Sequence, residues 1–258
     1  CRSMTYQKGN PLYDYCPFLE HQCLDSGYLA INQKTQNYSQ HATAIAALLV
    51  GNDPNAYLPD LGEFEYLGAL PNTKLHIYEF WHFLSRYLFK GLKFQADVLT
   101  ISAGVPLEDW WTRGLEQLAE NENLIIVAAA GNGTEVYDPM LYPAAGANVI
   151  GVGVMESIKS PENPHRLDSF TNPRPEHSST GPTAQGRTKP DIIAPGNCLI
   201  PSLNDIGGYE KSGDFSSFAV PLVSAAAALL VEQAKKQPEI AKAIAAPAGN
   251  CVIKAILM

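Results

Sequence analysis

The chain has 258 residues, of which 46% are hydrophobic, so it is long enough and apolar enough to bury the core of a large domain. Eighteen basic and twenty-six acidic residues give a formal net charge of −8, with no basic block, which argues against a nucleic-acid partner. The longest nearly apolar run, residues 218–231, is shorter than the roughly 20 residues that span a bilayer. We therefore predict no membrane helix and no membrane partner.

The first half of the chain alternates between strand and helix patterns after a weakly periodic start. Helix formers that end at a glycine predict a buried helix over residues 41–51, and the polar stretch 52–67 predicts a loop. The next predicted elements are a strand over 74–78, a helix with aromatic residues at helical spacing over 79–91, and a strand over 96–102.

The second half continues the same alternation. The predicted elements are an amphipathic helix over 107–121, strands over 124–130, 149–154 and up to 196, a polar loop over 160–185, and an almost wholly apolar helix over 217–235. The strand over 124–130 has no polar face, which is typical of a parallel strand covered on both sides. The sequence therefore predicts an α/β fold, a doubly wound and mostly parallel sheet flanked by helices.

Four polar residues lie just after predicted strands or at the start of predicted helices, where parallel sheets place their ligands. In chain order they are Asp25, His41, Asn132 and Ser217. Peptide-bond hydrolysis by a serine needs a nucleophile, a base, a carboxylate that orients the base, and donors for the oxyanion. This set contains one residue of each kind.

The segments around these residues resemble the subtilisin-like serine proteases, the subtilase family. Leu-Asp-Ser-Gly at 24–27 is similar to the aspartate motif, and His-Ala-Thr-Ala-Ile-Ala-Ala at 41–47 is similar to the histidine motif. The other similar segments, in the family's order, are 68–75, 96–104, 127–132, 179–196 and 217–224. The resemblance implies a subtilisin-like fold and one catalytic domain over residues 1–258, which we expect to be trimmed at both ends.

The resemblance also implies roles for individual residues. Ser217 is the expected nucleophile, His41 the base, Asp25 the carboxylate that orients His41, and Asn132 the oxyanion donor. The segments expected to hold the substrate as an added strand consist of Ile101, Ser102, Ala103 and Gly104, and of Ala129, Ala130 and Gly131. Activity is expected to fall below about pH 6.5, where His41 is protonated.

The expected partners are a protein or peptide substrate and a pro-segment or inhibitor. No cofactor is needed for the chemistry; structural calcium is an expectation by resemblance, and no metal ligands can be named. Because most relatives are exported, we expect a secreted or extracellular protein, although the five cysteines suit a reducing cytosol equally well.

Three features depart from the family pattern. Ala42 follows the motif histidine where a glycine is usual, and only sixteen positions separate Asp25 from His41. Phe215 stands two residues before Ser217 in place of a glycine. If that position needs a positive φ, phenylalanine costs roughly 1–2 kcal/mol and displaces Ser217.

Several alternatives follow from the sequence. Asp14 is a rival orienting carboxylate, and Cys16, His21 and Cys23 either form a metal site or are a loop disulfide or free thiols. The chain as a whole could instead be a pseudoprotease, a binding or scaffolding module with a misaligned triad. A third function would be acyl transfer to an amine by a peptide ligase or cyclase.

Overall fold

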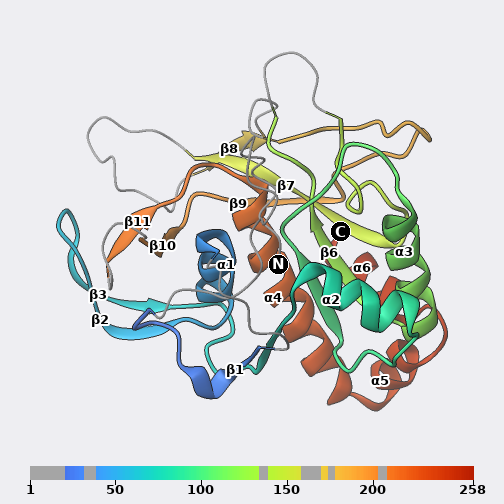
Figure 1. The fold of residues 1–258 in the computed structure, drawn as a ribbon, viewed down its shortest axis with the longest axis horizontal. Coiled ribbons are helices and arrows are strands. Elements are labelled where there is room, and N and C mark those ends of the chain that lie inside the picture. Colours follow the sequence, from blue (N-terminus) through green and yellow to red (C-terminus); the bar gives the residue numbers. More distant parts are fainter. Residues whose placement is uncertain (1–20, 32–38, 134–138, 158–169, 174–177, 203–207) are drawn as a thin grey trace.

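A computed structural model of the protein describes residues 21–31, 39–133, 139–157, 170–173, 178–202 and 208–258 (Figure 1). Its largest sheet contains five strands. They are β5 (Val98–Ile101), β6 (Ile125–Ala129), β7 (Val149–Ser157), β8 (Phe170–Pro173) and β9 (Ile192–Pro195). The pairs β5–β6, β6–β7 and β7–β9 are parallel, and β8 runs antiparallel to β7. The predicted α/β fold with a mostly parallel sheet is therefore confirmed.

Helices cover both faces of this sheet, as the apolar sequence of β6 predicts. Ile126 and Ala128 pack into one core cluster with α3 (Trp110–Glu122), whereas Val127 and Ala129 pack into another with α4 (Ser216–Lys235). All five residues of β6 are buried. Successive side chains of a strand point to opposite faces, so a strand with no polar residue needs cover on both sides.

Smaller elements surround this core. The remaining strands are β1 (Leu29–Ile31), parallel to β4 (Leu75–Ile77), and the antiparallel pairs β2 (Asn52–Leu58) with β3 (Gly62–Leu67) and β10 (Leu199–Pro201) with β11 (Tyr209–Lys211). The remaining helical segments are η1 (Ser26–Tyr28), α1 (Gln40–Val50), α2 (Phe80–Leu84), η2 (Ser85–Phe89), α5 (Pro238–Ala245) and α6 (Gly249–Leu257). Helix α1 packs against α4 through Ala44, Ile45 and Phe218.

The prediction of a loop over residues 52–67 is wrong, because this segment forms the β2–β3 hairpin (Figure 1). Its asparagine, aspartate, proline and glycine residues are typical of loops. Ala56 and Tyr66, however, are buried in a cluster with Cys23, Ala47 and Tyr209. Tertiary burial therefore overrides local propensity in this segment.

Two other predicted elements also change. The aromatic helix predicted over 79–91 is divided into α2 and the π-helix η2. The long loop predicted over 160–185 contains strand β8. The rival carboxylate Asp14 and the potential metal ligand Cys16 lie outside the described residues.

By length and composition alone, α4 is apolar enough to cross a membrane, and the bent pair α5 and α6 passes the same test only if it is counted as one span. Helix α4 packs against β5, β6, β7 and β9, and 56% of an apolar 18-residue stretch of this helix is buried inside the protein. An apolar helix at the centre of a fold needs no membrane to explain its composition.

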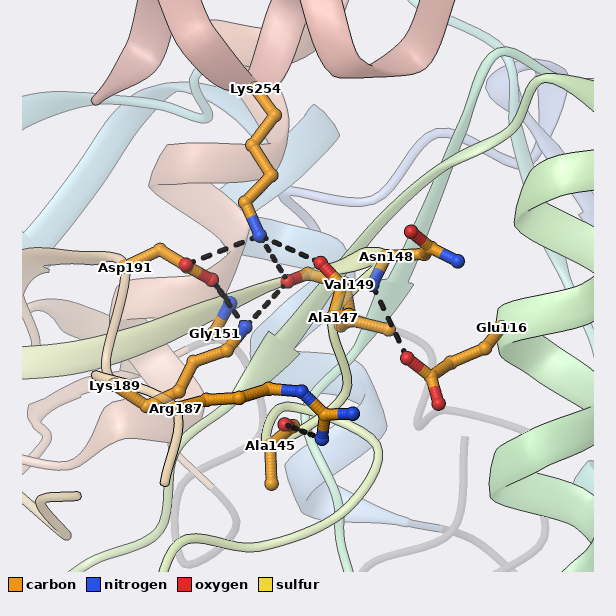
Figure 2. Close-up of polar contacts among 10 residues, drawn as sticks. All are labelled: Glu116, Ala145, Ala147, Asn148, Val149, Gly151, Arg187, Lys189, Asp191 and Lys254. Atoms are coloured by element: carbon orange, nitrogen blue, oxygen red, sulfur yellow. Dashed lines mark hydrogen bonds and ion pairs between the residues drawn. The ribbon is translucent and has the colours of Figure 1, made fainter. Parts of the chain in front are cut away.

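An ion-pair network joins the amino ends of β7 and β9 to α6 (Figure 2). The ammonium of Lys189 contacts Asp191 at 2.5 Å and donates to the carbonyl of Val149 at 2.8 Å. Lys254, on α6, contacts the other oxygen of Asp191 at 3.2 Å. The backbone N–H of Gly151 also donates to Asp191, at 2.7 Å. The side chains of Lys189 and Asp191 are buried and that of Lys254 is partly exposed, and each charge has a partner, which ties the C-terminal helix to the sheet.

Candidate active site

The carboxyl ends of β5 and β6 meet the first turn of α4. Asn132 lies three residues past the end of β6, Ser102 directly follows β5, and Ser217 is the second residue of α4. Parallel strands bring residues that follow them to the same edge of the sheet. The fold therefore brings together residues from three parts of the chain, and the hydrogen bonds to α4 span more than eighty positions.

The amide group of Asn132 has a defined orientation. Its Oδ1 accepts hydrogen bonds from the backbone N–H of Ser216 at 2.7 Å and from the Ser216 hydroxyl at 2.8 Å. A backbone N–H can only donate, so the atom facing it is the oxygen. The amide nitrogen of Asn132, the donor that an oxyanion needs, therefore points elsewhere. The side chain of Asn132 is exposed, which leaves this nitrogen accessible.

Ser216 holds this arrangement together. It is fully buried, and its hydroxyl also accepts a hydrogen bond from the backbone N–H of Gly131 at 3.2 Å. Sequence reasoning missed Ser216, because it looks like an ordinary residue at the start of a helix. The signal that could have found it is its position beside the expected nucleophile in the first turn of a buried helix.

Gly131 must be a glycine in this structure. Its φ is +118°, a conformation that other residues rarely adopt, and a Cβ there would collide with the Ser179 hydroxyl. The conformation of Gly131 places Asn132 opposite Ser216.

Ser217 lies at the amino end of α4 and is partly exposed. Its carbonyl accepts a hydrogen bond from the hydroxyl of Ser102 at 2.8 Å. Ser102, only 6% exposed, belongs to the predicted substrate segment. That segment therefore contacts the expected nucleophile through a side chain as well as lying near it.

Phe215 does not strain the turn that leads to Ser217. Its φ is −118° and its ψ is 136°, which is extended backbone that any residue adopts. The condition under which phenylalanine would displace Ser217, a positive φ, is not met. The ring of Phe215 is 42% exposed and lies 6.4 Å from the ring of Phe218, measured between centroids.

His41 lies beside the same turn. It is the second residue of α1, and its ring centroid is 5.7 Å from that of Phe218, the residue after Ser217. Burial lowers the pKa of His41 from 6.5 to about 4, because the charged imidazolium loses its hydration. The imidazole is therefore neutral at pH 7, the form that can accept a proton.

Asp25 has another partner in this structure. Its side chain is exposed, and its Oδ1 accepts a hydrogen bond from the backbone N–H of Gly27 at 2.7 Å. The Nδ1 atom of His41 is buried and has no hydrogen-bond partner among the described residues. Among the described residues, Asn132 is therefore hydrogen-bonded to Ser216, the residue before Ser217. Asp25 is instead hydrogen-bonded to its near neighbour Gly27.

The two predicted substrate segments differ in their backbone contacts. Ile101 ends β5, and the segment 102–104 continues beyond it until Val105 pairs with Tyr142. In contrast, the N–H of Ala130 donates to Val152 and its carbonyl accepts from Leu141. The carbonyl of Gly131 likewise accepts from Ser179. Ala129 to Gly131 is therefore tied to the protein's own backbone.

Among the described residues, no group of three or more His, Cys, Asp or Glu side chains is placed to hold a metal ion. His21 and Cys23 do contact each other, with 3.1 Å between Nδ1 and Sγ. Burial raises the pKa of the Cys23 thiol to about 12, so this thiol stays protonated.

Comparison with known proteins places the chain in a family. The model of the subtilase family matches residues 21–258. The chain belongs to this family. Human membrane-bound transcription factor site-1 protease is 32% identical over 185 residues, which cover 67% of this chain and 16% of that protein. The major intracellular serine protease of Bacillus subtilis is 25% identical over 206 residues, covering 75% of this subtilase and 56% of the relative.

The fold of this subtilase also matches solved structures. The prenylagaramide maturation protease PagA matches with a TM-score of 0.60 and 24% identity, over 91% of this chain and 77% of PagA. The chain spans only 17% of the length of another relative, the subtilisin-like protease SBT6.1 of Arabidopsis thaliana, to which it is 28% identical. The name of the first relative refers to a membrane-bound transcription factor, and that of the Bacillus subtilis relative to an intracellular protease.

Proposed function

We propose that this subtilase is a serine endopeptidase that hydrolyses peptide bonds of protein or peptide substrates through an acyl-enzyme intermediate. The proposal rests on its family and on one observation above all, the orientation of Asn132 beside Ser217. With its oxygen bonded to Ser216, the amide nitrogen of Asn132 has no hydrogen-bond partner among the described residues, and it is a donor next to a serine at a helix amino end. Both features favour a developing negative charge.

The proposed reaction begins with His41 taking the hydroxyl proton of Ser217 while its Oγ attacks the scissile carbonyl. The tetrahedral oxyanion accepts hydrogen bonds from the amide nitrogen of Asn132 and the backbone N–H of Ser217. His41 then gives its proton to the departing amine, which leaves an ester at Ser217. Water, deprotonated by His41, hydrolyses that ester and restores the free serine.

Asp25 is the carboxylate that we propose to orient His41. Its Oδ1 is bonded to Gly27 in the structure, so a contact with His41 has to form in the complex with substrate. A carboxylate against the imidazole stabilises the imidazolium that the reaction creates. We therefore expect Asp25→Asn to lower the turnover number for peptides by orders of magnitude.

The remaining parts of the proposal concern partners and environment. The segment 101–104 is expected to bind an extended peptide substrate. A pro-segment or inhibitor is expected to occupy the same site. Calcium, if bound, is proposed to stabilise the fold without taking part in the chemistry. Chelation should then lower the melting temperature and leave the labelling rate of the folded enzyme unchanged. Secretion stays a prediction, which localisation of the full-length protein tests.

The test is labelling of the purified chain with a fluorophosphonate probe, followed by peptide mapping, with Ser217→Ala as the control. We expect one probe per chain at Ser217 and none on the variant. A folded chain that fails to react would contradict the proposal and favour a binding module. If the chain reacts, the masses of the products formed from a peptide distinguish hydrolysis from transfer to an amine.

A further inference from the structure

The nucleophile's own carbonyl lacks its regular partner in α4. In an α-helix, the carbonyl of residue 217 accepts from the N–H of residue 221. Residue 221 is a proline inside the helix, and proline has no N–H. An apolar, mostly buried helix offers little water to replace the missing donor, so this carbonyl needs a donor from elsewhere.

Ser102 supplies that donor. Its hydroxyl lies 2.8 Å from the carbonyl oxygen of Ser217, although the two residues are 115 positions apart in the chain. Ser102 is only 6% exposed, so water competes poorly for this bond. Because the carbonyl can only accept, the hydroxyl of Ser102 is the donor.

We propose that Ser102 is a positioning residue that sets the place of Ser217 relative to the substrate segment. The inference rests on the proposed function and adds a residue to it. The hydrogen bond joins the end of β5 to the first turn of α4, so a substrate paired with the segment after β5 is held in register with the nucleophile. Pro221 makes this possible, because it leaves the carbonyl of Ser217 free to be held from outside the helix.

Replacing each partner in turn tests this coupling. Ser102→Ala removes the donor, Ser102→Thr keeps it, and Pro221→Ala returns a backbone N–H to the helix. The four variants are these three and the double variant Ser102→Ala/Pro221→Ala. The measurements are the second-order rate of fluorophosphonate labelling at Ser217 and the melting temperature of each protein.

We expect Ser102→Ala to label about tenfold more slowly, the effect of one lost hydrogen bond to a buried carbonyl. Ser102→Thr should regain most of the rate. In the Pro221→Ala background, Ser102→Ala should lower the rate less than about twofold, because the helix again satisfies the carbonyl of Ser217. Coupling of this kind between two residues appears as non-additivity in the double-mutant cycle.

Two results would overturn the inference: unchanged labelling by Ser102→Ala, or a loss that is as large in the Pro221→Ala background as in the parent protein. If Ser102→Ala does not fold, the comparison of the double variant with Pro221→Ala decides the question in the same way. Failure of the inference is distinct from failure of the proposed function. In the first case the parent protein still labels at Ser217; in the second it does not.

Discussion

The pH at which activity is lost on acidification depends on the pKa of His41 in the free enzyme. The sequence predicts a loss of activity below about pH 6.5, whereas in the structure burial lowers the pKa of His41 to about 4. A lowered pKa keeps the imidazole neutral, and so able to accept the proton of Ser217, to lower pH. The structure therefore predicts that activity persists well below pH 6.5.

The difference is largest near pH 5. With a pKa of about 4, roughly 90% of His41 is neutral at this pH, whereas with a pKa of 6.5 only roughly 3% is neutral. The two values therefore predict labelling rates that differ roughly thirtyfold. The assay is the second-order rate of fluorophosphonate labelling between pH 3.5 and pH 8, with circular dichroism at each pH to establish that the protein is folded.

A midpoint near pH 6.5 or above would refute this reasoning. It would mean that a carboxylate pairs with His41 before substrate binds, since a nearby negative charge raises the pKa of histidine. The variant Asp25→Asn is the matched control. It should leave the midpoint near pH 4, because Asp25 is exposed and bonded to Gly27 in the free protein.

Three further predictions concern Asn132, the ion-pair network and Gly131. Ser216→Ala removes one of two donors to Asn132, so kcat should fall about fivefold to tenfold with KM unchanged, and Ser216→Thr should restore it; a change in KM alone would contradict the proposed orienting role. Lys189→Met should lower the free energy of unfolding, measured in urea, by about 3 kcal/mol. This value is near the low end for breaking a buried ion pair, because Lys254 still contacts Asp191. The control Lys236→Met, which removes an exposed ion pair, should lower the free energy of unfolding by less than about 1 kcal/mol. Equal decreases for the two variants would contradict a stabilising role of the network. Gly131→Ala should lower both the melting temperature and the labelling rate, and a variant with parental values of both would show that φ at this position is not restrictive.

Much of the fold follows from the sequence, because burial on both sides leaves a strong pattern. The apolar run of β6, the alanine-rich α4 and the helix formers of α1 all form the elements that their periodicity predicts. The order of Asp25, His41, Asn132 and Ser217 along the chain also indicates the family, which the match over residues 21–258 confirms. These features can be recognised along the chain and need no knowledge of tertiary contacts.

Only the tertiary structure decides how the site residues are oriented. The amide of Asn132 faces Ser216 because Gly131 adopts a positive φ, and Ser102 reaches Ser217 because β5 ends beside α4. The hairpin over residues 52–67 likewise forms because its few apolar residues find a core contributed by distant segments. Hydrogen-bond partners and burial depend on residues far away in the chain, so neither propensity nor spacing determines them.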